Sequence, residues 1–178
     1  MKKIIMSVVA AAVAFFMAGC DKGKDITPEK ITTVSTVIGR TAGYACELSK
    51  TKTEVKEAIA KVLDIASTVV PTNGQTFVEA WTPVIDAELK KLVEAGKIDA
   101  AGAQVAKIAL GVACEGIDYV FIKYPKAKEV KELVSAAVTG FVSGYKSVVT
   151  DALKAGEKPE IDEEALKYLK SKMAASAK

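Results

Sequence analysis

The stretch VIGRTAGYACE, Val37–Glu47, contains two short patterns that each occur a second time in the chain. The first is GRTAG, Gly39–Gly43, whose glycine spacing recurs in GFVSG, Gly140–Gly144. Residues four apart lie on one face of a helix, so each pair of glycines leaves a strip where another backbone can approach closely. The second pattern is GYACE, which recurs as GVACE at Gly111–Glu115.

The glycine pairs are also typical of helix dimers inside membranes. The longest uncharged run around the second pair, Leu133–Tyr145, has only thirteen residues, whereas a spanning helix needs about twenty. We therefore interpret both pairs as sites of close helix packing within a bundle.

Apolar residues recur at three- and four-residue spacing along most of the chain, which predicts amphipathic helices. An Asn73-Gly74 hairpin signal lies between two such segments and is interpreted as a turn. The sequence thus predicts an all-α fold, a compact bundle of about five helices plus a short charged C-terminal helix. The expected helices cover 28–49, 53–70, 77–95, 99–124, 126–153 and 161–173.

Local signals place several of the expected helix ends. Thr27 and Pro28 are typical of a helix start, and Asp99 is a candidate N-cap. Gly96 is expected to close the third helix. Pro83, inside that helix, either kinks it or restarts it with Thr82 as the cap.

The first twenty residues, MKKIIMSVVAAAVAFFMAGC, have a positive start, an uncharged and mostly apolar run of fourteen residues, and small residues at the end. This order is typical of a secretory signal and too short for a comfortable membrane span. Its ending, Met17–Cys20, resembles the lipobox of bacterial lipoproteins, with Met17 where that box usually has leucine. An ordinary signal peptide with an incidental cysteine is the alternative.

The resemblance implies that residues 1–19 are removed and that Cys20 carries diacylglyceryl and palmitate-type acyl chains. Residues 20–27 would form a lipidated tether, and the protein would face the periplasm, anchored in the bacterial envelope. Asp21 is similar to the inner-membrane retention signal of enterobacterial lipoproteins, so the inner membrane is favoured while the outer membrane stays open.

The GxACE phrase is followed each time by EVKE, at 54–57 and at 129–132. One interpretation is that the first two helices are a duplicate of the fourth and fifth, two helical hairpins joined by a middle helix. The other is coincidence among common residues. Under duplication Cys46 and Cys114 are equivalent, and after lipidation of Cys20 they are the only thiols left. We predict a Cys46–Cys114 disulfide, with two buried free thiols as the alternative.

Composition narrows the function. The chain has no histidine, which removes His-based catalytic triads and His-ligated zinc. Arg40 is the single arginine, and loss of residues 1–19 leaves 23 basic against 22 acidic residues, so nucleic acid is not an expected partner. No phosphate loop, calcium loop or nucleophile motif is present, so we expect no cofactor, no metal and no enzymatic activity.

Two hypotheses of function remain. The first is a non-enzymatic envelope lipoprotein that acts by protein–protein interaction, as an assembly factor, an inhibitor or an exclusion-type protein. The second is a carrier of a lipid or another apolar small molecule in a cavity between helices. In both, residues 28–156 form the helical domain and residues 157–178 form a charged C-terminal helix and tail.

Overall fold

The computed structural model describes residues 26–46, 48–72, 74–150 and 160–176, and within these ranges it contains helices and no strand. The predicted all-α bundle is therefore confirmed. The lipobox, Cys20 and Asp21 lie outside the described residues. The α-helices are α2 (Pro28–Ala45), α3 (Thr53–Ala66), α4 (Phe77–Glu94), α5 (Ala100–Lys123), α6 (Lys131–Val149) and α7 (Glu163–Ser176), with 3₁₀ turns η1 (Leu48–Lys50) and η2 (Pro125–Glu129).

Three of the predicted helix ends are confirmed by their caps. The hydroxyl of Thr27 accepts a hydrogen bond from the N–H of Lys30 at 3.4 Å, with Pro28 in the first turn. The carboxylate of Asp99 accepts from the N–H of Gly102 at 2.6 Å. Gly96 ends α4 with a φ of 64°, a left-handed conformation that glycine adopts without a steric cost.

Other expected ends differ. The second helix stops at Ala66, before the predicted residue 70, and the fifth begins at Lys131 because Pro125–Glu129 forms a separate 3₁₀ turn. Of the two alternatives for Pro83, the restart with Thr82 as cap is wrong. A capping box of Thr76 and Glu79 starts α4 earlier, and the helix continues through Pro83.

The closest helix contact joins α2 to α6, and both glycine pairs lie in it. An added methyl group at Gly39 would overlap the carbonyl oxygen of Phe141, and one at Gly144 would overlap the carbonyl oxygen of Thr36. Close packing of the glycine faces within the bundle is therefore confirmed. The duplication hypothesis makes α2 with α3 and α5 with α6 the two hairpins. In the structure, however, α2 packs mainly against α6 and not against α3. Duplication of the two halves stays a prediction.

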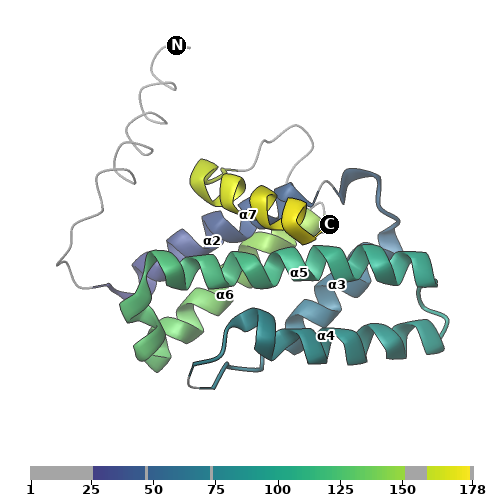
Figure 1. Cartoon of the computed structure of the whole chain (residues 1–178), viewed down its shortest axis with the longest axis horizontal. Coiled ribbons are helices and arrows are strands. Elements are labelled where there is room, and N and C mark those ends of the chain that lie inside the picture. Colours follow the sequence, from purple (N-terminus) through teal and green to yellow (C-terminus); the bar gives the residue numbers. More distant parts are fainter. Residues whose placement is uncertain (1–25, 47, 73, 151–159, 177–178) are drawn as a thin grey trace, which may run out of the picture.

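Figure 1 shows α5 lying between α4 and α7, with α2, α3 and α6 behind this layer. The core between the layers includes Trp81 and Phe77, whose rings meet edge to face with centroids 5.0 Å apart. The C-terminal helix α7 belongs to the bundle, since Ala165 and Leu169 are fully buried against it. None of the described helices is both long and apolar enough to cross a membrane.

Candidate binding sites between the helices

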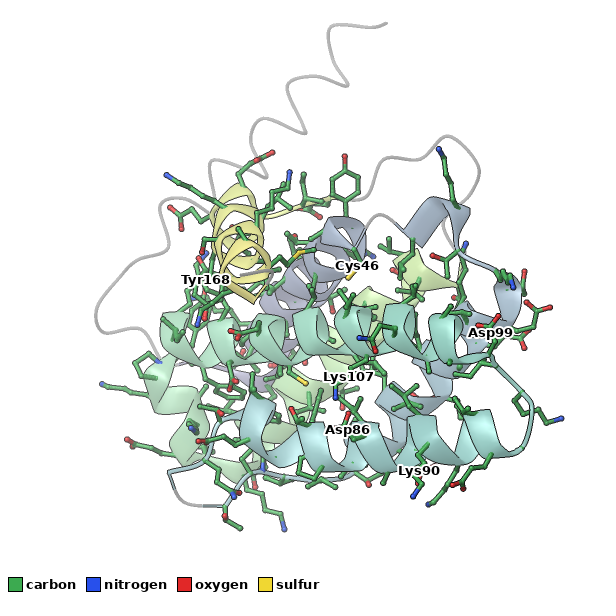
Figure 2. The ribbon with its side chains drawn as sticks, turned by 45° about the vertical axis from the view of Figure 1, so that its right-hand side comes forward. Cys46, Asp86, Lys90, Asp99, Lys107 and Tyr168 are labelled. Atoms are coloured by element: carbon green, nitrogen blue, oxygen red, sulfur yellow. The ribbon has the colours of Figure 1, made fainter. Side chains whose placement is uncertain are left out.

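The predicted disulfide is wrong, because Cys46 and Cys114 are both free thiols. Cys46 lies at the C-terminal end of α2 (Figure 2), where its Sγ donates to the carbonyl of Ala42 at 3.2 Å. The same sulfur lies 3.5 Å from the hydroxyl of Tyr145, which donates to the carbonyl of Ala109 at 2.7 Å. Cys46 therefore contacts Tyr145 of α6 and the backbone of α5 at Ala109.

The two copies of GxACE are not equivalent in space, which explains the error. Cys46 caps the end of one helix, whereas Cys114 lies in the middle of α5. Burial raises the pKa of the Tyr145 hydroxyl and both cysteines add to that rise, but no bond joins their sulfur atoms. The alternative, two thiols that act as small hydrophobic groups, fits this arrangement.

The second copy of the phrase instead lines a hollow on the outer surface of α5, which we call the interhelical pocket. It has a volume of about 450 Å³, within the range of small-molecule sites. Its walls come from α4, α5 and α7. The lining residues are Val78 and Thr82 of α4, Ile108, Gly111, Val112, Cys114 and Glu115 of α5, and Leu169, Lys172 and Met173 of α7.

Charged groups tie α7 to α5 at one end of the interhelical pocket. The carboxylate of Glu115 accepts a hydrogen bond from the hydroxyl of Tyr168 at 3.2 Å and pairs with the ammonium group of Lys172 at 3.5 Å. That ammonium group also lies 5.4 Å from the centre of the Tyr168 ring. Figure 2 shows Tyr168 on α7, at the edge of this layer.

The opposite wall, α4, is held by Asp118 and by an ion pair. The Asp118 carboxylate accepts hydrogen bonds from the N–H groups of Phe77 at 2.8 Å and Val78 at 3.1 Å, the first residues of α4. Burial raises the pKa of Asp118, and the two N–H groups act against that rise. Farther along, Asp86 of α4 and Lys107 of α5 face each other with N and O 2.7 Å apart (Figure 2).

The thiol of Cys114, which lines the interhelical pocket, has low reactivity as a nucleophile. Burial, with a smaller effect of the nearby carboxylates of Asp118 and Glu115, raises its pKa from 9.0 to about 12. Burial likewise raises the pKa of Cys46 to about 11. Both thiols are therefore protonated at neutral pH and are poor nucleophiles. Among the described residues, no cluster of His, Cys, Asp and Glu side chains is suited to hold a metal ion.

A second hollow, which we call the α6 groove, has a volume of about 980 Å³. It follows the face of α6 opposite to the glycines that contact α2. The apolar part is formed by valines at four-residue spacing, and short hydroxyl side chains line the adjacent row. The α6 residues are Lys131, Val134, Ser135, Val138, Thr139, Val142, Ser143, Lys146, Ser147 and Thr150, with Ser67 and Val70 following α3 and Lys128 and Glu129 in η2.

The charge around the α6 groove is positive. Lys128, Lys131 and Lys146 line it together with one carboxylate, Glu129. Lys146 is fixed across the groove by an ion pair with Asp64 of α3, with N and O 2.7 Å apart. An acidic ligand is therefore favoured over a basic one at this surface.

Sequence reasoning included a cavity between helices in its carrier hypothesis, but it did not place either hollow on particular helices. It singled out GVACE, which lines the interhelical pocket, but interpreted its cysteine as half of a disulfide. Asp118 and Lys172 were also missed, because an isolated carboxylate and an isolated lysine on helices have no local pattern that predicts their partners. The chain matches no protein-family model, no curated protein and no solved structure.

Proposed function

We propose that this protein is a non-enzymatic lipoprotein of the bacterial envelope that acts by binding another envelope protein. Lipidation of Cys20 would hold the bundle at a membrane on the periplasmic side, with the inner membrane favoured by Asp21. Assembly factors, inhibitors and exclusion-type proteins all work in this way. The observation that carries the proposal is the α6 groove.

The groove suits an amphipathic helix of the partner. Its α6 side runs from Lys131 to Thr150, a distance of about 28 Å along a helix. The buried Val134 and Val138 form its floor, next to the half-buried Val142. The exposed side chains beside the valines, such as Ser135, Thr139 and Ser143, are short, so a second helix backbone can come close. Docking an amphipathic helix into such a groove is a common mode of recognition.

The lysines define the expected partner more closely. A helix with apolar residues at three- and four-residue spacing and glutamate or aspartate on its flanks would pair with Lys128 and Lys131. Charge complementarity mainly sets partner choice and association rate. Apolar area for a partner to cover comes from Val70, which is 58% exposed, and from the half-buried Val142.

Site-specific photo-cross-linking of the full chain in cells tests the proposal. A benzophenone side chain at Thr139, exposed in the groove, is expected to capture one membrane-associated protein through a single acidic, amphipathic segment. The control position is Lys170, an exposed residue of α7 outside both hollows. Lys131→Glu is expected to reduce capture from Thr139. Equal capture from Lys170, or capture unchanged by Lys131→Glu, would contradict the groove as the binding surface.

A further inference from the structure

The interhelical pocket contains real space beside the α5 backbone. Gly111 is exposed at the floor of the hollow, and a methyl group added there would meet no atom within 4 Å, whereas the bundle packs against Gly39, Gly43 and Gly116. Its α5 wall extends from Ile108 to Glu115, about 10 Å along the helix. The hollow is therefore long enough for a hydrocarbon chain of roughly eight carbons, lying along α5 between α4 and α7.

We propose that the interhelical pocket binds a neutral, single-chain amphiphile, with its hydrocarbon chain beside Gly111 and its hydrogen-bonding head at Glu115 and Lys172. This second site is independent of the α6 groove and of the partner proposed for it. The ligand class follows from the two ends of the pocket, which differ in polarity.

Apolar side chains of three helices surround the position of the chain. Val78 comes from α4, Val112 from α5, and Leu169 and Met173 from α7. Methionine adapts its shape to irregular ligands, which suits a flexible chain. Ile108 lies at the mouth with 58% of its surface exposed, so a bound hydrocarbon would cover an apolar side chain that water now contacts.

The polar end selects a head without net charge. Glu115 and Lys172 are 3.5 Å apart and neutralise each other, so a charged head would have to compete with one of them for the other. A hydroxyl or amide group can donate to the carboxylate and accept from the ammonium group without breaking the pair. The protonated thiol of Cys114 adds no charge to the pocket at neutral pH, because burial raises its pKa to about 12.

The walls are also held in place before a ligand arrives. Asp118 fixes the start of α4 through the N–H groups of Phe77 and Val78, and the Glu115 contacts fix α7. A preformed pocket loses less conformational entropy on binding than a flexible one.

The test uses the full chain in lipid nanodiscs and a decanol analogue that carries a diazirine on its hydrocarbon chain. After illumination, labelled peptides are mapped by mass spectrometry. We expect saturable labelling of 108–115 and 169–173 that unlabelled decanol competes away. Gly111→Leu, which fills the pocket, is expected to reduce this labelling by about tenfold or more. Ala101→Leu, on an exposed position of α5, adds the same side chain outside the pocket and is expected to leave it unchanged.

Ile108→Glu gives a second variant, at an exposed position where folding does not depend on the side chain, and it is expected to weaken labelling as well. Circular dichroism checks that each variant is folded. Labelling of the pocket segments that survives both Gly111→Leu and Ile108→Glu would overturn the proposal. Labelling that does not saturate, or that maps only to other segments, would overturn it too.

Discussion

Substitution of Gly39 by alanine provides the sharpest test of the close contact between α2 and α6. The added methyl group would overlap the carbonyl oxygen of Phe141 and lie 2.9 Å from the backbone nitrogen of Tyr145. Both are backbone atoms of a helix, so they cannot rotate away as a side chain would. The two helices must therefore separate along a face that is otherwise fully packed.

The size of the effect follows from two opposing terms. Overpacking of a tight core costs about 1–3 kcal/mol, and rigid backbone neighbours place Gly39→Ala near the upper end. Replacing a helical glycine by alanine stabilises a helix by about 1 kcal/mol, which leaves a net loss of roughly 2 kcal/mol. Gly111→Ala is the matched control, because it has the same propensity gain and meets nothing within 4 Å. It is expected to raise stability by up to about 1 kcal/mol.

Urea unfolding followed by the fluorescence of Trp81, together with thermal unfolding by circular dichroism, measures the difference. The two variants are expected to differ by about 3 kcal/mol, which for a domain of this size separates their Tm values by roughly 6–12 °C. Similar urea m-values would show that both unfold from equally compact states. If Gly39→Ala were as stable as Gly111→Ala, the glycine-mediated contact between α2 and α6 would be refuted.

Three further predictions concern Cys20, Cys114 and Asp118. Cys20→Ala is expected to move the protein from the membrane to the soluble fraction after cell lysis, and unchanged fractionation would contradict the anchor. N-ethylmaleimide at pH 8 is expected to modify Cys114 roughly a thousandfold more slowly in folded than in unfolded protein, because folding raises the pKa of this thiol from 9.0 to about 12. Mass spectrometry measures both rates, and equal rates in folded and unfolded protein would contradict the prediction. Burial raises the folded-state pKa of Asp118, so its contribution to stability is complete below the unfolded pKa and declines as pH rises through the folded value. In urea titrations the wild type is therefore expected to lose stability relative to Asp118→Asn as the pH rises from about 3 to 7. A wild type that gains stability relative to the variant over this range would contradict the raised pKa.

Several features of the fold were predictable because their causes are local in the sequence. The start of α2 at Thr27 and Pro28 depends on hydrogen bonds within one helical turn, as does the Asp99 cap. The end of α4 depends on the left-handed conformation of Gly96. The glycine pairs showed that two helix faces permit close approach, since residues four apart always share a face.

The partners of those faces were not predictable in the same way. The sequence indicated that Gly39 and Gly140 each lie on a helix face that lacks large side chains, but it did not show that the two faces contact each other. That choice depends on the free energy of packing across more than a hundred residues of chain, which no local pattern encodes.

The sequence by itself determined that this chain forms an all-α bundle, where most of its helices start, and which faces can pack closely, because these depend on neighbours within one or two turns. Only the tertiary structure decided that Cys46 and Cys114 stay free thiols, one at the end of α2 and one within α5, and that GVACE lines a pocket. The physical reason is the rotation of an α-helix by about 100° per residue, so the environment of a side chain depends on which neighbour each face of its helix meets.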